Sequence, residues 1–249
     1  MKSYRLRAYD RKAIKGFVGL IGVDEAGRGA LAGPVVAAAV AARNEFYDTN
    51  WCRRNASRIN DSKLLTKEER EELYDKLRWL ERNDRLIIGV GRATVEEIED
   101  LNILGATQVA MRRAIEEVLE KGSISAHDPD PLFASEGDEE VETLSSWKIM
   151  VDGKPMKALG FQHEALVKGD TKALCIAMGS IVAKVSRDRW MMALDCDYPH
   201  YDFASSKGYA TVAHRAAISE KGPTPEHRAL FLRKILDEAP KDNQEEFGF

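Results

Sequence analysis

Cysteine is scarce in this chain, and its scarcity excludes several kinds of site. The three cysteines, Cys52, Cys175 and Cys196, are scattered, odd in number and without the spacing of metal ligands. They indicate reduced thiols rather than a disulfide framework, as expected for a protein of the cytoplasm. Histidine is also sparse, with five residues in 249, and no cluster of histidine and cysteine offers a zinc site.

Long hydrophobic runs are missing as well. No apolar stretch is long enough to span a bilayer, and residues 1–7 lead into charge instead of the apolar core of a signal peptide. The chain also lacks the lysine motif of phosphate-binding loops and the serine turn of α/β-hydrolases. We therefore expect a cytoplasmic protein without membrane association, whose function rests on neither of these motifs.

An excess of positive charge is absent too, because the formal net charge is −4. The acids are unevenly placed: residues 121–146 hold seven acids and one base, and residues 237–249 hold five acids and one base. The remaining chain has 35 bases and 29 acids, so its body is mildly basic. A basic body suits a nucleic-acid partner, but a solvated surface explains it equally well, and charge alone leaves both open.

Apolar runs and helical periodicities alternate along the chain. Residues 121–146 hold glycine, serine, proline and acids without periodicity, so we expect an exposed insertion there. Capping-box patterns begin at Thr66 and Thr94. Strands that alternate with helices predict an α/β fold. We expect strands at residues 17–24, 34–42, 85–91, 147–151 and 164–167, and helices at residues 66–81, 104–120, 171–194, 210–220 and within 225–238.

Acidic residues follow three of the expected strands. Asp24 and Glu25 close the first strand, Asp152 closes a later one, and Asp170 follows a short one. A glycine-rich turn at residues 27–29 comes directly after the first pair and lets a polar ligand approach the backbone. Carboxylates at the ends of neighbouring strands converge, and hard divalent cations prefer oxygen ligands. Two such ions roughly 4 Å apart could activate a water and stabilise a leaving oxygen in a displacement at phosphorus.

The acids also have structural alternatives. An aspartate after a strand often caps a turn or a helix, and Asp170 before Thr171 fits an N-cap. Asp188 lies four residues after Lys184 in a predicted helix, so an ion pair between them is favoured over a ligand role. The spacing of the acids alone therefore leaves the metal site undecided.

Other residues have plain alternatives of the same kind. The glycines at 27, 29 and 33 fit a simple hairpin, and Tyr209 alone fits a core position. Four histidines are expected at the surface or in support of a site: His163, His200, His214 and His227.

Taken together, these residues resemble one family. Residues 22–29 (GVDEAGRG), followed by residues 31–40 (LAGPVVAAAV), are similar to the signature of type 2 ribonuclease H, bacterial ribonuclease HII. The similarity runs from about residue 17 to residue 231 in family order, which is far more specific than any single piece. Shorter matches follow at Asp61-Ser62-Lys63, Val151-Asp152-Gly153, Lys168-Gly169-Asp170, Lys207-Gly208-Tyr209 and His227-Arg228.

The resemblance implies a ribonuclease H-like α/β fold, with a central mixed β-sheet flanked by helices and a C-terminal helical segment. A single catalytic domain would cover residues 1–238, and residues 239–249 would form a disordered tail. Within the domain, the core would span about 16–200, the C-terminal helical part about 201–238, and the acidic insertion about 121–146.

The resemblance also assigns roles to residues. A four-carboxylate site for two Mg²⁺ or Mn²⁺ ions would consist of Asp24, Glu25, Asp152 and Asp170, which makes Asp170 a ligand and not only a cap. The substrate contacts implied are Gly27, Arg28, Gly29, Ser62, Lys63 and Tyr209, with Tyr209 against the ribose of the ribonucleotide. The supporting positions implied are Lys184, Arg187 and Asp188, of which Lys184 and Arg187 are also weaker phosphate candidates.

The activity implied is endonucleolytic cleavage of RNA in RNA–DNA hybrids and on the 5′ side of single ribonucleotides in duplex DNA. Products would carry 3′-hydroxyl and 5′-phosphate ends, and the enzyme would act as a monomer in ribonucleotide removal, DNA repair and primer removal. Residues 244–249, from Gln244 to Phe249, faintly resemble a sliding-clamp peptide, although a disordered end is the favoured interpretation. Two rivals stay open: a non-catalytic nucleic-acid-binding protein with this fold, and a carboxylate–metal phosphatase of small phosphoesters.

Overall fold

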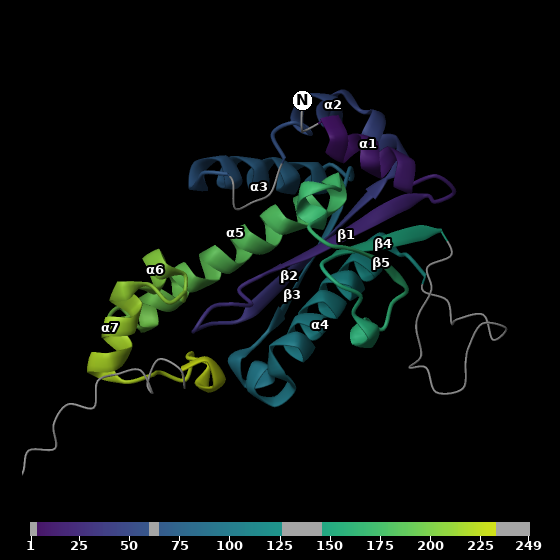
Figure 1. Ribbon diagram of the computed structural model, residues 1–249. Helices are drawn as coiled ribbons and strands as arrows, with labels where there is room; N and C mark the ends of the chain where they lie inside the picture. The colour runs from purple at the N-terminus through teal and green to yellow at the C-terminus, as the bar shows by residue number, and fades with distance from the viewer. Residues whose placement is uncertain (1–3, 60–64, 126–145, 233–249) are drawn as a thin grey trace, which may run out of the picture.

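Five strands form one mixed sheet in the computed structural model, which describes residues 4–59, 65–125 and 146–232. The strand order is β3-β2-β1-β4-β5. Strands β1, β2 and β3 pair antiparallel, whereas β4 runs parallel to both β1 and β5 (Figure 1). The predicted central mixed sheet is therefore confirmed. The bounds are β1 Gly19–Ala26, β2 Val35–Arg43, β3 Ile87–Ala93, β4 Trp147–Asp152 and β5 His163–Leu166.

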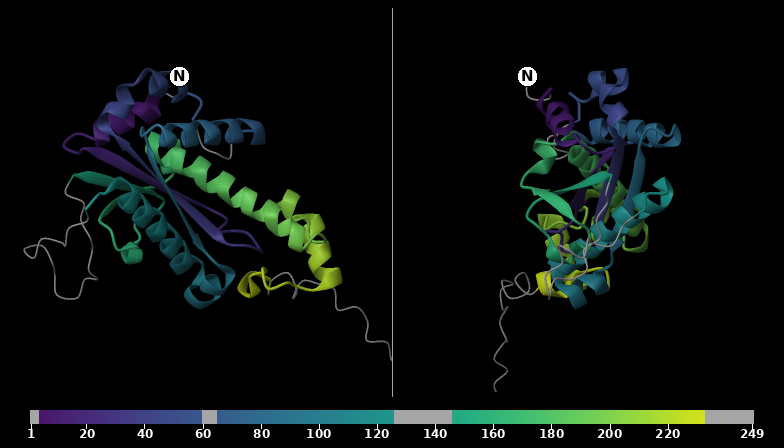
Figure 2. Two further views of the ribbon diagram at one scale, coloured as in Figure 1. Left: turned by 180° about the vertical axis from the view of Figure 1, so that it is seen from behind. Right: turned by 90° about the vertical axis from the view of Figure 1, so that its right-hand side faces the viewer.

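Helices cover both faces of the sheet, as predicted. Helices α1, α3 and α5 pack on one face, and α4 packs on the other (Figure 2). Helices α6 and α7 lie at the far end of α5, away from α1, and build a separate apolar cluster there (Figure 1). The α-helices are α1 Tyr4–Ala13, α2 Asn50–Asn55, α3 Lys67–Arg82, α4 Val95–Gly122, α5 Leu174–Asp197, α6 Phe203–Ser206 and α7 Val212–Lys221. Short 3₁₀ helices are η1 Asn44–Asp48, η2 Lys157–Leu159 and η3 Gly169–Thr171.

The central strands are buried on both faces. All but one of the nine residues of β2 are buried, and β1 is buried from Gly19 to Asp24. A strand covered on both faces needs apolar side chains at every position, rather than at alternate ones. This is why the two nearly continuous apolar runs of the sequence predicted these strands.

Two helix starts follow the predicted capping boxes. Thr66 caps α3 and Thr94 caps α4, each with a glutamate three residues later that bonds back to the cap. Within α4 the backbone breaks at Asn102, where φ is 58°. Its side chain accepts from the amides of Leu104 and Gly105, so a new helical stretch begins there. The predicted start at residue 104 is the start of this second stretch.

Other element predictions need correction. The sequence did not indicate α1 or α2, and α5 begins at Leu174 rather than at residue 171. The N-terminus of α5 is capped from another element: the Asp10 carboxylate accepts from the amides of Leu174 and Cys175, at 3.0 and 2.8 Å. The N-cap role considered for Asp170 is therefore wrong for this helix. Most of the last predicted helix, from residue 233 on, and residues 126–145 of the predicted insertion lie outside the described residues.

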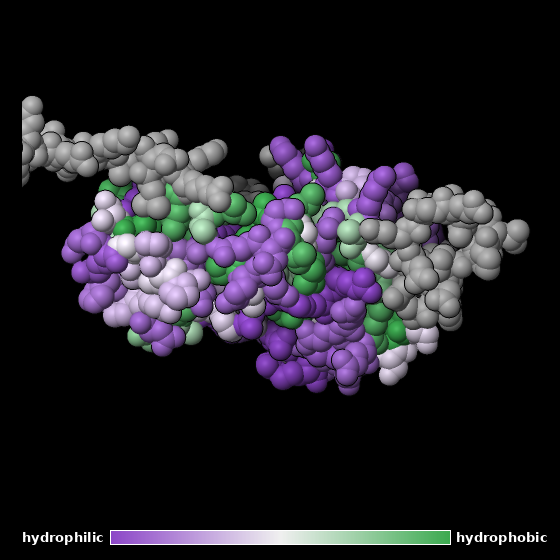
Figure 3. Space-filling view, turned by 90° about the horizontal axis from the view of Figure 1, so that it is seen from below, coloured by the Kyte–Doolittle hydropathy of each residue, from purple (hydrophilic) through white to green (hydrophobic). Residues whose placement is uncertain are grey.

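The surface carries polar and charged groups over most of the face seen from below. Apolar residues form small separate groups on this face rather than one continuous patch (Figure 3). Among the helices that the structure describes, none combines the length and hydropathy required to cross a membrane.

Asp10 generates a prediction about stability. Burial raises the pKa of Asp10 from 3.8 to about 7, against the lowering effect of the hydrogen bonds from Cys175 and Leu174. The protonated form is therefore favoured in the folded state, and this stabilisation is full below about pH 3.8 and lost as the pH rises through about 7. We expect the stability of the native sequence to fall relative to Asp10→Asn between these values, by up to about 1.4 kcal/mol per pH unit.

The measurement is urea unfolding of both proteins from pH 4 to pH 8. The lost hydrogen bond of Asp10→Asn gives an offset that does not depend on pH, so only the slope tests the claim. Parallel curves for the two proteins would show that Asp10 does not titrate in this range.

Candidate active site

Three aspartates converge at one edge of the sheet. In the parallel pairing of β1 with β4, Val23 lies opposite Val151, so Asp24 and Asp152 follow at neighbouring positions. Asp170 lies in η3, just beyond β5, which runs parallel to β4. One carboxylate oxygen from each aspartate lies within 4.8 Å of the other two. The predicted convergence of acids at strand ends is thus present for these three.

The turn between β5 and η3 brings Asp170 into this group. Lys168 takes a left-handed conformation with φ 57°, which bends the chain back after β5. The amide of Gly169 then donates to Asp152 Oδ1. This hydrogen bond ties the loop that carries Asp170 to the strand that carries Asp152.

Without a cation, three ionised aspartates this close would repel one another, and burial would deprive them of water. Only 5% of Asp24 and 4% of Asp170 is exposed. Burial raises the pKa of Asp24 well above its usual range, and the charges of Glu25 and Asp152 raise it further, while a hydrogen bond with Ser180 acts in the opposite direction. A cation among these oxygens would remove the repulsion, so the donor set fits a divalent metal.

Glu25 lies beside this group, but not within it. Its Oε1 accepts from Arg28 at 3.1 Å, and its Oε2 is buried without a hydrogen-bond partner among the described residues. Burial raises the pKa of Glu25, whereas Arg28 lowers it. A buried carboxylate oxygen without a partner is costly, and a cation bound to it would remove that cost. The role of Glu25 as a fourth ligand stays a prediction.

Asp24 and Glu25 face a pocket of about 470 Å³. It is lined by Asp24, Glu25, Ala26, Gly27, Arg28, Gly29, Ser180, Lys184 and Tyr209. Carboxylates, the glycine-rich turn and the predicted ribose contact therefore share one space. Tyr209 is 36% exposed, so the core position considered for it is wrong.

The two glycines of the turn have different surroundings. Gly27 has φ +97°, and a Cβ there would lie 1.9 Å from Nε of Arg187, so only glycine fits. A Cβ on Gly29 would meet no atom within 4 Å. Gly27 is thus required by the fold, whereas the space around Gly29 is open.

Two buried arginines hold the loop of residues 27–34, named the recognition loop below. Arg187 donates to the carbonyls of Ala32, Pro34 and Lys207. Arg228 donates to three carbonyls of the same loop, those of Arg28, Ala30 and Gly33. Both side chains are fully buried. This burial suits a supporting position for Arg187 better than a phosphate contact, and both roles stay predictions.

Arg228 is a residue that the sequence interpretation missed. Burial lowers its pKa to about 9, and the charge of Arg187 acts in the same direction. The only available signal was the His227-Arg228 match, which assigned no role. Its partners lie about two hundred residues earlier in the chain and are backbone atoms, which leave no mark in a sequence.

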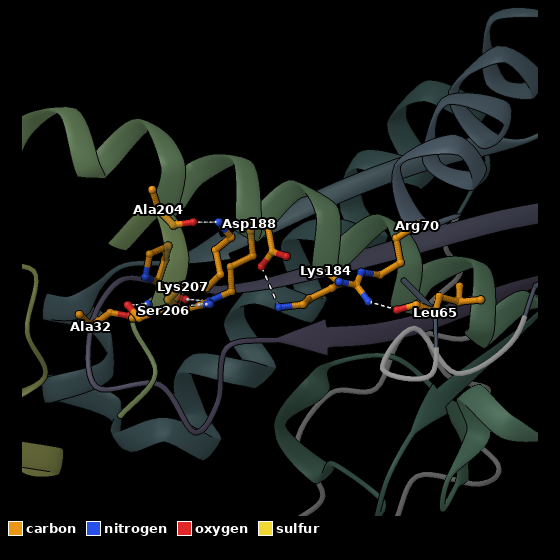
Figure 4. A network of polar contacts seen from close by, with 11 residues as sticks. Ala32, Leu65, Arg70, Lys184, Asp188, Ala204, Ser206 and Lys207 are labelled. Atoms are coloured by element: carbon orange, nitrogen blue, oxygen red, sulfur yellow. Dashed lines mark hydrogen bonds and ion pairs between the residues drawn. The ribbon is translucent and has the colours of Figure 1, made fainter. Parts of the chain in front are cut away.

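The remaining predicted residues fall into three groups. Lys184 and Asp188 form the expected ion pair along α5, at 2.8 Å (Figure 4). Ser62 and Lys63 lie outside the described residues. His214 and His227 are buried and lie 3.0 Å apart at their Nε2 atoms, so a surface position is wrong for both.

Comparison with known proteins agrees with this geometry. The family profile described as Ribonuclease HII matches residues 21–234. This chain belongs to the ribonuclease HII family. Ribonuclease HII of Albidiferax ferrireducens is 41% identical over 220 residues, covering 88% of this chain and 89% of that protein. Ribonuclease HII of Fusobacterium nucleatum is 42% identical over 221 residues, covering 88% and 87%.

Solved structures of ribonucleases H2, HII and HIII share the fold. Ribonuclease H2 of Pyrococcus horikoshii is 26% identical with a TM-score of 0.55, covering 88% of this chain and 97% of that one. Ribonuclease HII of Archaeoglobus fulgidus, solved in complex with PCNA, is 22% identical with a TM-score of 0.58. The match covers 92% of this chain and 98% of that one. Bst-RNase HIII in complex with Mn²⁺ is 15% identical with a TM-score of 0.59. The match covers 93% of this chain and 73% of that one. The ribonuclease H-like fold is confirmed, and the chain is a metal-dependent endoribonuclease of the ribonuclease HII family.

The buried acids predict a thermal response to metal. Mg²⁺ at about 100 times its dissociation constant should raise the melting temperature of the native sequence by about 5 °C or more, because it binds only the folded site. Asp24→Asn should lose most of this rise, while its metal-free form should be at least as stable as the native protein, because one repelling charge is gone.

The measurement is differential scanning calorimetry with EDTA or with Mg²⁺. Asp100→Asn, at an exposed acid of α4, is the matched control and should keep the full response. An equal rise in Asp24→Asn would show that Mg²⁺ acts elsewhere on the protein.

Proposed function

We propose that the enzyme cleaves the RNA strand of RNA–DNA hybrids and the phosphodiester on the 5′ side of single ribonucleotides in duplex DNA. The products carry 3′-hydroxyl and 5′-phosphate ends. The observation that carries this proposal is the shared pocket, in which Asp24 and Glu25 face the same space as the turn at residues 27–29 and Tyr209. A nuclease that selects ribonucleotides needs both chemistry and sugar recognition at one phosphodiester.

The carboxylates Asp24, Glu25, Asp152 and Asp170 would hold two divalent ions, Mg²⁺ or Mn²⁺. Such ions would supply activation of a water nucleophile and stabilisation of the leaving oxygen in an in-line displacement at phosphorus. The buried acids of this chain support such binding, since the pKa of Asp24 is raised by burial and by neighbouring carboxylates. Bst-RNase HIII, which shares the fold, was solved with Mn²⁺.

The backbone of residues 27–29 is suited to the ribose. The 2′-hydroxyl is the local feature that separates RNA from DNA, and it both donates and accepts hydrogen bonds. Peptide amides and carbonyls can meet it only where no side chain intervenes. The open space at Gly29 supports this approach, and the packing of Gly27 on Arg187 keeps the turn in one conformation.

Tyr209 supplies an aromatic face and a hydroxyl to the same pocket. Its ring lies 5.3 Å from the guanidinium carbon of Arg187 and 5.6 Å from the ammonium of Lys184. These contacts hold the ring while leaving part of it exposed. We assign Tyr209 to the ribose and its neighbouring sugar, and Lys184, which also lines the pocket, to an adjacent phosphate.

Further partners follow from relatives and stay proposals. Ribonuclease HII of Archaeoglobus fulgidus was solved with PCNA, which supports a sliding-clamp contact for this enzyme. Residues 244–249, the segment predicted for that contact, lie outside the described residues. The cellular role we propose is ribonucleotide removal in DNA repair and primer removal.

One experiment tests the function directly. An all-DNA duplex and its twin with one ribonucleotide are incubated with the enzyme, with and without Mg²⁺. We expect a nick on the 5′ side of the ribonucleotide only with metal, no cleavage of the all-DNA twin, and retained binding but no cleavage with Asp24→Asn.

The rival functions give different results in the same assay. A non-catalytic binding protein would retain the labelled duplex without nicking it. A phosphatase of small phosphoesters would hydrolyse p-nitrophenyl phosphate and leave the duplex intact, and either result would end the proposal.

Substitution of Tyr209 tests the ribose contact. Tyr209→Ala should lower kcat/KM at a single embedded ribonucleotide by about 10-fold to 100-fold, because one stacked aromatic contact is worth roughly 1–3 kcal/mol. The loss on long RNA–DNA hybrids should be several-fold smaller. Tyr209→Phe is the matched variant, since it keeps the ring and removes only the hydroxyl. Equal losses on both substrates would argue against a reading role.

A further inference from the structure

We propose that His214 and His227 are positioning residues for ribonucleotide selection, a hydrogen-bonded pair that fixes Tyr209 relative to the recognition loop. This inference rests on the proposed role of Tyr209 and explains how that residue is held. Neither histidine lines the pocket, so the pair acts through Tyr209 and not on the substrate.

The pair forms a continuous chain of hydrogen bonds. The amide of Thr224 reaches Nδ1 of His227 at 2.9 Å. Nε2 of His227 and Nε2 of His214 lie 3.0 Å apart, and Nδ1 of His214 lies 2.8 Å from the carbonyl oxygen of Tyr209. The chain thus runs from the segment before His227, through both rings, to the backbone of Tyr209.

The partners fix the tautomer of each ring. An amide can only donate, so Nδ1 of His227 accepts and its proton lies on Nε2. That proton is donated to Nε2 of His214, whose own proton must then lie on Nδ1. A carbonyl can only accept, so His214 donates to Tyr209. Each ring nitrogen is therefore either a donor or an acceptor, and every hydrogen bond is donated in the direction from Thr224 to Tyr209.

Aromatic packing keeps both rings neutral. His214 packs on Phe203 at 5.3 Å between ring centroids, and His227 packs on Tyr201 at 5.0 Å. Burial lowers the pKa of His227 to about 4 and lowers that of His214 as well. Two neutral imidazoles can share one proton between their Nε2 atoms, whereas two imidazolium ions could not.

The segment of His227 is also bonded to the recognition loop. Its backbone forms a β-bridge with Ala32, and the next residue, Arg228, has its amide bonded to the carbonyl of Leu31. On the other side, the carbonyl of Gly208, next to Tyr209, accepts from the amide of Leu31. Besides Arg187, which donates to the carbonyls of both Ala32 and Lys207, two routes join the loop to Tyr209. One is direct, at Gly208, and the other runs through the histidine pair. Two attachment points fix an orientation that one point would leave free to pivot.

A double-mutant cycle tests this inference. The quantity measured is the ratio of kcat/KM on a single embedded ribonucleotide to kcat/KM on a continuous RNA–DNA hybrid, for the native protein, Tyr209→Ala, His214→Phe and the double variant. His214→Phe keeps an aromatic ring of similar shape and removes both hydrogen bonds. His214→Gln is a second variant, which offers His227 an amide oxygen but removes the imidazole donor to Tyr209.

We expect His214→Phe and His214→Gln to lower the ratio by about fivefold to tenfold, the scale of one lost hydrogen bond. The double variant should have the same ratio as Tyr209→Ala, because His214 acts only through Tyr209. Leu77→Ala, at a buried position of α3 outside the apolar cluster that holds the pair, is the structural control: it lowers the melting temperature and should leave the ratio unchanged.

Three results would overturn the inference. Equal loss on both substrates in both His214 variants would mean that the pair only stabilises the fold. A ratio in the double variant below that of Tyr209→Ala would mean that His214 acts independently of Tyr209. An unchanged ratio in Tyr209→Ala itself would refute the proposed reading role of Tyr209, and this inference with it, and is distinguished from the first two by that single variant.

Discussion

The repulsion among Asp24, Asp152 and Asp170 is the constraint on which this structure depends. Three carboxylates held within 4.8 Å of one another, two of them buried, would move apart unless the surrounding fold opposed it. The opposition comes from the parallel strands β1 and β4, which are locked by main-chain bonds, and from the Gly169 amide that donates to Asp152. Part of the folding free energy thus offsets the repulsion among these carboxylates, and a bound divalent cation would reduce that repulsion.

Helix α5 completes the cavity, and its position is set from a distance. At Gly22, two residues before Asp24, the backbone of β1 comes so close to Cys175 that a Cβ would lie 2.1 Å from its carbonyl carbon. The same Cys175 amide is bound by Asp10 of α1. The hydrogen bonds to Asp10 therefore hold the start of α5 against β1. Ser180, nearly two turns along α5, forms a hydrogen bond with Asp24. A helix outside the expected core of residues 16–200 supports the acids.

The sequence predicted features that depend on local order. Strand ends with acids gave Asp24 and Asp152, capping boxes gave the starts of α3 and α4, and an i,i+4 spacing gave the Lys184–Asp188 pair. Features made by distant segments did not follow from pattern. The cap on α5 comes from 164 residues away, and Arg228 binds backbone carbonyls, which any sequence supplies. The strand pattern left Asp170 undecided between a ligand and a cap, and only the ordered match to a family favoured the ligand role and pointed to Tyr209.

The arginines explain why the recognition loop can be both glycine-rich and rigid. Arg187 and Arg228 have only backbone carbonyls as their hydrogen-bond partners among the described residues, and no carboxylate forms an ion pair with either there. Their positive charge is therefore not cancelled locally, and it lies behind the wall that a phosphodiester would face. The contacts to its carbonyls fix the loop, and a buried cation behind it favours an anionic backbone in front. Arg187 and Arg228 thus give the loop both its rigidity and the positive charge behind it. Exposed lysines would supply the charge but not the rigidity.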